Sequence, residues 1–392
     1  MSHRLARYFW QSLLSCAALV AIFLTASLIA AEEPAGEAQV LTRARELVLQ
    51  LGSSNYNERE AATEQLARLG WPARPALEAG LKDPHPETRL RVQRILSLIR
   101  EDDFQRAITA LLADDAGQGE HPLPLWPKFR DDVGRDLASR ELFVAMLRAE
   151  GSLLADVAAQ PRGAAVSLQR RCEQLQFESA AQDREINAGS LAAVLFVAGD
   201  ERVPLALGTD SLLYRFCSHS AVVKVLEDRD DRGPLRKVIG AWVGTGRGGY
   251  YSLRLAMAYD MPEGLVAAGK MLDARTEAYY RQYAILTFAK LGTKQDLPRL
   301  EKLLGDAALC STHTVDDVTY ITQFRDIALV AVLHLSGEDP TEYGFTNLRP
   351  HDDYVYSPYT IGFAGEVDRQ AAFTKWEEFR RTVAPSDAGK SE

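Results

Sequence analysis

Two short stretches combine histidine with aspartate in a way that could bind a metal ion. His313, Asp316 and Asp317 fall within "HTVDD", and two aspartates follow His351 in "HDD". Imidazole nitrogens and carboxylate oxygens are common ligands of Zn²⁺. Neither stretch has the H-E-x-x-H spacing that places two histidines on one helical face. Helix capping and turn formation explain the same residues, so we predict no metal and no other cofactor.

A glycine-rich stretch, "GTGRGG" (residues 244–249), has the composition of a phosphate-binding loop. Such a loop follows a hydrophobic strand, and a P-loop ends in Lys followed by Ser or Thr. Here the glycines stand between two predicted helices, and no Lys-Ser/Thr pair follows. We interpret the stretch as a turn between helices, in which Arg247 could bind an anion weakly.

Cysteine and histidine offer little further chemistry. Beyond Cys16 there are three cysteines without a C-x-x-C pair, and an odd number cannot complete a disulfide framework. We expect Cys172 and Cys217 to be small buried side chains, with one bridge between them as the alternative. His219 and His334 are single histidines in apolar helices. No G-x-S-x-G nucleophile motif occurs, so whether the chain is an enzyme stays open, and we favour a role without catalysis.

Aromatic residues gather near the C-terminus, in the long segment 338–368. Long loops and tyrosine-rich surfaces often carry recognition. One interpretation is that the segment folds back and caps the open end of a helical array. The other is that it presents aromatic side chains to a partner. The residues predicted for that partner contact are Tyr343, Phe345, Tyr354, Tyr356 and Tyr359.

A helical pattern recurs along the chain: an arginine, a small residue three positions later, and large apolar residues at positions seven and ten. These offsets lie on one face of a helix. Alanine at the third position lets a neighbouring helix approach closely. The pattern starts at Arg59, Arg89, Arg281, Arg325 and Arg369, and its alanines are Ala62, Ala284, Ala328 and Ala372.

The stretch "LKDPHPETRLRVQRIL" (residues 81–96) resembles the second-helix signature of HEAT-like repeats. In that resemblance Asp83 corresponds to the family's aspartate, and Asp306 stands at the corresponding place after the later repeat. The family's arginine corresponds to Arg59, Arg89, Arg281 and Arg325, while Arg369 matches only the repeated pattern of this chain. The family implies that these polar residues connect turns and helices, which is a structural role. Thr88 and Val92 depart from the family pattern, and the spacing of 44 residues between the last three arginines requires inserted loops.

The resemblance implies an all-α fold, an armadillo-type α-solenoid of stacked helical hairpins. We expect HEAT-like repeats at 32–113, a linker at 114–132, and a degenerate helical block at 133–273. C-terminal repeats with the inserted loop follow at 274–383, and a disordered tail at 384–392. Period-two alternation of β-branched residues is scarce, so we predict no sheet.

The N-terminus has the layout of an export signal over residues 1–31. Arg4 and Arg7 precede an apolar stretch, and no charged residue follows until Glu32. Residues 8–31 are also long enough to anchor the chain in a bilayer if they are not cleaved. A lipidated Cys16 is a third option. In each case we expect the rest of the chain to be exported: periplasmic, secreted, or anchored and facing outward.

The net charge of −9 would become −11 on removal of the two N-terminal arginines, which argues against nucleic acid as a partner. The first functional hypothesis is a scaffold that binds a protein or peptide. The second is an enzyme or small-ligand-binding protein, with its site between residues 244–251 and the aromatic loop. The third is a structural envelope component held by its N-terminus.

Overall fold

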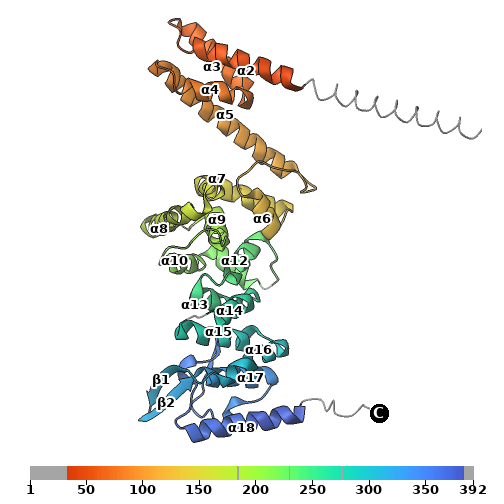
Figure 1. Cartoon of the computed structure of the whole chain (residues 1–392), viewed down its shortest axis with the longest axis vertical. Helices are drawn as coiled ribbons and strands as arrows, with labels where there is room; N and C mark the ends of the chain where they lie inside the picture. Colours follow the sequence, from red (N-terminus) through yellow and green to blue (C-terminus); the bar gives the residue numbers. More distant parts are fainter. Residues whose placement is uncertain (1–32, 183–184, 229, 275–276, 384–392) are drawn as a thin grey trace, which may run out of the picture. The chain divides into compact units, whose positions relative to one another are not determined.

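The computed structural model describes residues 33–182, 185–228, 230–274 and 277–383. The predicted signal segment and the C-terminal tail lie outside these residues. The described chain is mostly helical, in agreement with the predicted all-α class (Figure 1). It divides into two compact units, Met1–Ala113 and Asp114–Glu392. No described helix combines the length and the apolar character that crossing a bilayer requires.

Unit 1 consists of helices packed around one small core. Its elements are α2 (Glu33–Gln50), α3 (Tyr56–Leu69), the short η1 (Trp71–Ala73), α4 (Arg74–Gly80) and α5 (Pro86–Ala113). Helix α2 packs against α3 and α4, and α5 contacts both of them. Leu47, Leu66, Leu77 and Ile95 are fully buried where the helices meet, and Ala62 is buried among them. Apolar residues at helical spacing therefore give each helix one buried face.

Two arginines of unit 1 make the same pair of hydrogen bonds. The Nη1 atom of Arg59 donates to the carbonyl oxygens of Ser53 (2.8 Å) and Ser54 (3.2 Å). The Nη1 atom of Arg89 donates to the carbonyl oxygens of Asp83 (2.7 Å) and Pro84 (2.9 Å). Each arginine thus binds the turn before its own helix. The side chain of Asp83 accepts from the backbone N–H of His85 in the same turn.

Unit 2 is also mainly helical, and within it the helices follow one another in chain order in Figure 1. Helix α9 contacts both α7 and α12 and is buried from Gly189 to Ala198, so it forms the centre of the first part of this unit. The first elements are α6 (Trp126–Asp132), α7 (Leu137–Ala159), η2 (Pro161–Ala164), α8 (Ala165–Gln182), α9 (Ala188–Gly199), α10 (Thr209–Phe216), α11 (Ser220–Glu227), α12 (Pro234–Gly244), α13 (Gly249–Ala258) and α14 (Glu263–Asp273).

The second part of unit 2 shares a core that extends from α13 to the last helix. Ala284 and Ala328 are fully buried and Ala372 is 2% exposed, as their places in the repeated pattern require. Its elements are α15 (Ala278–Leu291), η3 (Lys294–Asp296), α16 (Leu297–Glu301), η4 (Lys302–Gly305), β1 (Leu309–Val315), β2 (Val318–Gln323), α17 (Phe324–Ser336), η5 (Pro340–Tyr343), β3 (Pro350–His351), β4 (Val355–Tyr356), η6 (Pro358–Thr360) and α18 (Glu366–Val383).

The segment 114–132, expected to be a linker, belongs to the core of unit 2. Helix α6 lies within it, and both Trp126 and Phe129 are buried. Phe129 packs against Phe143 of α7 and Phe196 of α9, with ring centroids 5.0 and 5.3 Å apart. The proline and glycine residues of this segment suggested a linker between two helical blocks. Its buried aromatic side chains instead anchor the segment to α7 and α9.

Helix α7 is kinked at Glu150, whose backbone angles are not helical (φ −134°, ψ 33°). The buried carboxylate accepts two hydrogen bonds from Arg171 (2.7 and 2.9 Å) and one from the hydroxyl of Ser190 (2.6 Å). This buried charge therefore has an opposite charge and hydrogen bonds that offset its desolvation. The hydrogen bonds of Glu150 thus connect α7 to α8 through Arg171 and to α9 through Ser190.

The prediction of no sheet is wrong for residues 309–323, where β1 and β2 form an antiparallel hairpin. Its two-residue loop, Asp316 and Asp317, has positive φ at both positions (47° and 62°), the conformation of a type I′ turn. The β-branched residues of "STHTV" and "VTYIT" on either side of Asp-Asp are a hairpin signal that the helical interpretation missed. A second, two-residue pairing joins β3 and β4.

The arginines of the repeated pattern in unit 2 bind side chains from distant parts of the sequence. Arg281 pairs with Asp306, and its guanidinium carbon lies 4.0 Å from the centre of the Phe324 ring. Arg325 donates to Glu366 (2.9 Å). Arg369 is 4% exposed, and its Nε atom donates to both carboxylate oxygens of Asp326 (2.9 and 3.2 Å), which is fully buried.

Candidate functional site

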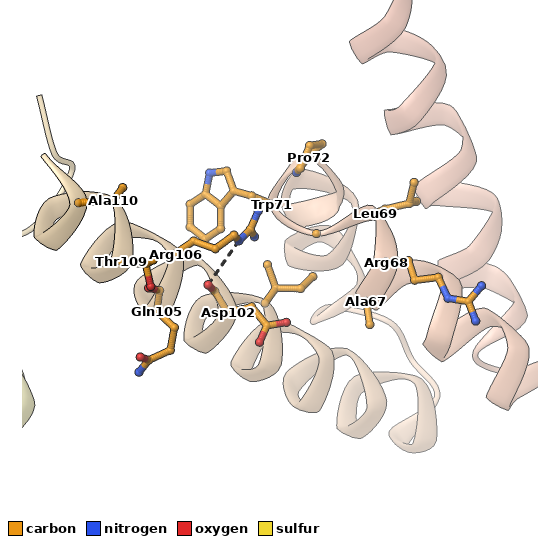
Figure 2. Close-up of a pocket in the computed structure, with 13 residues that line it drawn as sticks. Ala67, Arg68, Leu69, Trp71, Pro72, Asp102, Gln105, Arg106, Thr109 and Ala110 are labelled. Carbon is orange, nitrogen blue, oxygen red and sulfur yellow. Dashed lines mark hydrogen bonds between the residues drawn. The ribbon is translucent and has the colours of Figure 1, made fainter. Parts of the chain in front are cut away.

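A groove of about 790 Å³ lies in unit 1, between the turn after α3 and the second half of α5 (Figure 2). Trp71 stands at its edge with 43% of its surface exposed. Figure 2 shows the indole beside Arg106 of α5. We call this hollow the Trp71 groove. It is lined by Ala67, Arg68, Leu69, Gly70, Trp71, Pro72, Ile99, Asp102, Gln105, Arg106, Thr109, Ala110 and Ala113.

Local sequence explains why Trp71 faces outward. Gly70 ends α3 with φ at 66°, a conformation that favours glycine, and its N–H donates to the carbonyls of Leu66 and Ala67. Pro72 is the second residue of η1, where its missing N–H costs little. The indole is also held by Arg74, whose guanidinium carbon lies 4.6 Å from the ring centre. The turn thus presents one face of a rigid aromatic side chain to the groove.

The opposite wall is one face of α5. Asp102, Gln105, Arg106 and Thr109 follow at helical spacing, so their side chains lie together. The Nε atom of Arg106 makes a long hydrogen bond to the carbonyl of Asp102 (3.4 Å), and its guanidinium pairs with Asp103. The groove therefore offers an aromatic surface, amide and hydroxyl groups, and charges of both signs.

The groove is elongated. The lining residues of α5 extend from Ile99 to Ala113, which at 1.5 Å per residue is about 20 Å of helix. An extended peptide rises about 3.3 Å per residue. Roughly six residues of extended chain therefore match the length of the groove.

A second candidate region lies in unit 2, where the aromatic loop meets α13. The hydroxyls of Tyr250 and Tyr354 are 2.6 Å apart, and the Tyr283 ring packs against both of theirs. The rings of Tyr214 and Tyr251 stack with centroids 5.0 Å apart. We call these five residues the tyrosine cluster. The structure thus joins the end of the 244–251 stretch to the aromatic loop.

A pocket of about 360 Å³ opens beside the tyrosine cluster. The guanidinium carbon of Arg254 lies 5.9 Å from the centre of the Tyr214 ring. Burial raises the pKa of Tyr214, and burial together with the Tyr354 hydrogen bond raises the pKa of Tyr250. These phenols therefore stay protonated at neutral pH and act as hydrogen-bond donors. The pocket is lined by Ser211, Tyr214, Arg215, Cys217, Ser218, Tyr251, Leu255 and Tyr259.

The aromatic residues predicted for partner contact are mostly in the core. Tyr343, Phe345 and Tyr354 are 3%, 1% and 7% exposed, and Tyr356 is half-buried. The side chains fold back onto α15, α17 and α18 because together they cover a shared apolar core. Only Tyr359, with 61% of its surface exposed, is open to a partner. The capping interpretation of the loop therefore fits its burial better than the recognition interpretation does.

The guanidinium of Arg247, which by its sequence context could bind an anion weakly, is occupied by backbone carbonyls. Its Nη1 atom donates to the carbonyls of Ala198 (3.0 Å) and Asp200 (2.8 Å), and its Nη2 atom to that of Val203. These carbonyls lie at and beyond the end of α9, where no intrahelical donor remains. Burial lowers the pKa of Arg247. The glycine-rich turn thus positions an arginine that caps a helix.

The histidine and aspartate stretches do not converge. His313 stacks on Tyr320, while Asp316 and Asp317 form the hairpin turn. The Nδ1 atom of His351 accepts from the backbone N–H of Asp353. Within the part of the chain that the structure describes, no group of three or more His, Cys, Asp or Glu side chains could hold a metal ion.

The cysteines of the described residues are unpaired thiols. Cys172 and Cys217 are buried, and burial raises the pKa of each to about 12. Burial also raises the pKa of Cys310, to about 11. Because the thiolate is the reactive form, all three are poor nucleophiles at neutral pH.

Sequence reasoning missed the Trp71 groove. A tryptophan directly after a helix-ending glycine and before a proline was a usable signal, since a turn places such a ring at the surface.

No protein-family model matches this chain, and comparison with curated proteins and with solved structures likewise found no match.

Proposed function

We propose that this chain is an exported, non-catalytic α-helical scaffold that binds an extended segment of a partner protein in the Trp71 groove. The observation that carries the proposal is the half-exposed indole of Trp71 beside Arg106, above a groove about six residues long. Tryptophan and arginine are enriched among the residues that dominate binding energy at protein interfaces. A rigid indole supplies a large contact area with little loss of conformational entropy.

The proposal includes a HEAT-like solenoid architecture. The matching hydrogen bonds of Arg59 and Arg89 support this architecture. In two successive helical repeats of unit 1, the arginine at the same position binds the carbonyls five and six residues earlier. Burial of Ala62, Ala284 and Ala328 supports close helix crossings. Stacked helical units form extended surfaces that are suited to binding peptides.

Selection from a random peptide library displayed on phage, with residues 32–392 as bait, tests the binding function. Selected peptides should bind in a fluorescence-anisotropy titration. Trp71→Ala should weaken that binding at least tenfold, since truncation of a central tryptophan commonly costs about 2 kcal/mol or more. Thr109→Trp, which fills the groove and loses only the hydrogen bond of the Thr109 hydroxyl to the Gln105 carbonyl (2.9 Å), should weaken it similarly.

Tyr359→Ala is the matched control, because Tyr359 is an exposed aromatic residue of the other unit. Its affinity for the selected peptides should equal that of the parent chain. Circular dichroism of each variant checks that the helices remain. If the library yields no binder, or if the peptides bind Trp71→Ala as tightly as the parent, the proposed function is wrong.

Export is tested separately, with residues 1–31 fused to a reporter enzyme that is active only outside the cytoplasm. Activity should appear with the intact segment and disappear when residues 8–31 are deleted. Membrane fractionation of the full chain then distinguishes a cleaved signal from an anchor. An anchored chain without peptide binding would favour a structural role in the envelope.

The tyrosine cluster favours a second candidate function, the binding of a small planar ligand. Tyrosine faces, neutral phenol donors and the nearby Arg254 suit an aromatic ring that carries a carboxylate. Ligand-induced protection of α13 from hydrogen exchange, lost in Tyr251→Ala, would support this function.

A further inference from the structure

In the described structure the outer edge of strand β1 makes no backbone hydrogen bond to another strand, although α15 and η6 lie close to β1. Strand β2 is bonded on its other side, where the N–H of Ile321 donates to Phe363 (3.0 Å) and that of Phe363 donates back to Ile321 (3.2 Å). Strand β1 pairs with β2 alone. The hairpin therefore has one open edge.

The register identifies the backbone groups at this edge. Ile321 directs its N–H and C=O toward Phe363, away from β1. Its partner across the hairpin, Thr312, therefore belongs to a pair without ladder hydrogen bonds, and its own N–H and C=O point outward. The same holds two residues later for Thr314, opposite Thr319, where the two hydroxyls are 3.2 Å apart.

The edge lacks the charged side chains and prolines that often prevent pairing with another chain, and its one irregularity, a register shift between Leu309 and Ser311, lies before Thr312. From Leu309 to Val315 there is no Lys, Arg, Asp, Glu or Pro. Thr312 and Thr314 are exposed. The exposed face of the hairpin is uncharged as well, since it consists of these threonines with Leu309, Thr319 and Ile321. The opposite face is partly covered: Thr322 is buried, and its hydroxyl donates to the carbonyl of Ile361.

We propose that β1 pairs antiparallel with β1 of a second copy of this chain, which joins two hairpins into one four-stranded sheet. An antiparallel pair of identical strands satisfies two-fold symmetry, so one edge serves both copies. Pairing Thr312 of each copy with Thr314 of the other uses every outward group of these residues and forms four backbone hydrogen bonds. The symmetry axis then passes beside His313.

Charge favours a second copy as the occupant. In this register Asp316 of each chain lies opposite Cys310 of the other, so no two acidic side chains face each other. A two-stranded sheet by itself is marginally stable in water, and two added strands extend its hydrogen bonding. The inference concerns unit 2 and does not depend on peptide binding in the Trp71 groove.

Sedimentation of residues 32–392 over a range of concentrations tests the proposal. We expect a reversible dimer, and slower hydrogen exchange of the amides of residues 309–315 as the concentration rises. Thr312→Pro removes only an outward N–H, so it should leave the hairpin intact and raise the dimer dissociation constant at least tenfold. Thr312→Val keeps that N–H and should dimerise like the parent.

Hydrogen exchange of the backbone amides of residues 318–323, measured in the Thr312→Pro variant, checks that the hairpin persists. If that variant loses the hairpin, Thr314→Lys supplies the same test, because two added positive charges at the pairing edge should also produce monomers. A parent chain that stays monomeric up to about 1 mM overturns the proposal. So does a dimer that neither Thr312→Pro nor Thr314→Lys weakens.

Discussion

Arg59 and Arg89 of unit 1 stand at the same position of the sequence pattern as Arg281 and Arg369 of unit 2, yet the two pairs bind different groups. The arginines of unit 1 donate to backbone carbonyls five and six residues earlier in the chain. Each of these contacts closes a turn before a helix. The arginines of unit 2 instead pair with carboxylates far away in sequence, and Arg369 also pairs with the nearby Glu366.

The distance along the chain changes what the contact does. Arg281 reaches Asp306 beyond α16, and Arg369 reaches Asp326 at the start of α17. Asp326 also accepts from the backbone N–H of Gln323 and so caps α17. A local arginine stabilises one turn, whereas a distant one fixes the positions of two elements. Burial then sets the cost of losing it, because an unpaired buried carboxylate is strongly unfavourable.

The largest expected effect is at Arg369. Arg369→Met leaves the fully buried Asp326 without its cation, and we expect a loss of about 3–5 kcal/mol in the stability of α17 and α18. Hydrogen exchange of peptides from the two helices measures it. The double variant Arg369→Met with Asp326→Leu should recover all but about 1 kcal/mol, the value of the lost cap. A single variant as stable as the parent would remove the distinction between the two units.

A smaller effect is expected at Arg281, which is half-buried. Arg281→Met loses a charge-assisted hydrogen bond and the contact with the Phe324 ring, together about 2 kcal/mol. Arg281→Lys should lose less, since it keeps the charge. Urea unfolding followed by circular dichroism compares the two variants. Equal losses would mean that packing, not charge, explains the contribution of Arg281.

The same pair predicts a dependence on pH. Burial acts to raise the pKa of Asp306, but the hydrogen bond and charge of Arg281, together with the hydrogen bond from the backbone N–H of Ala308, outweigh burial and hold the pKa below the usual 3.8. A lowered pKa in the folded state means that the pair stabilises the fold above pH 3.8 and that this stability is lost as the pH falls through the folded pKa. Arg281→Met should therefore lose less stability than the parent between about pH 5 and pH 2. Parallel acid titrations monitored by circular dichroism check the difference.

In unit 1 we expect small and equal effects. Arg59→Ala and Arg89→Ala each remove two hydrogen bonds to partly exposed carbonyls, which should cost about 1 kcal/mol apiece. Hydrogen exchange in α3 and α5 measures each loss. Unequal losses, more than about 1 kcal/mol apart, would indicate that the matching geometry hides different roles.

The smallest effect should come from the ion pair between Glu64 and Arg68 on the surface of α3. Both side chains are mostly exposed, at 67% and 77%, so solvent screens their attraction. Glu64→Gln should change the stability of unit 1 by less than about 0.5 kcal/mol. The same hydrogen-exchange measurement on α3 provides the check, and a larger change would show that exposed charge matters here.

Local patterns predicted the helices well where apolar periodicity and end signals agreed. Helices α9 and α14 begin at such end signals, since Asn187 caps the first and Pro262 precedes the second. Within the helical block predicted at 133–273, residues 210–226 contain no proline and no glycine, yet the structure divides them into α10 and α11 at residues 217–219. The residues there are compatible with a helix, so packing of the two short helices, not propensity, decides the break.

The candidate sites were only partly predictable. The sequence indicated that residues 244–251 and the aromatic loop belong together, and Tyr250 and Tyr354 do meet. It did not indicate that Tyr343 and Phe345 are buried, because aromatic side chains serve both cores and interfaces. Nor did it reveal the Trp71 groove, which depends on how far α5 continues beyond the turn that follows α3.

The amino-acid sequence by itself determined the helical class, the buried faces of most helices and the turn chemistry at Gly70, since these depend on residues within one or two helical turns. Only the tertiary structure decided which carboxylate each arginine of unit 2 meets, which tyrosines are exposed, and that β1 has an open edge. Those outcomes depend on contacts between residues distant in the sequence, where many partners of equal chemistry compete and packing selects one of them.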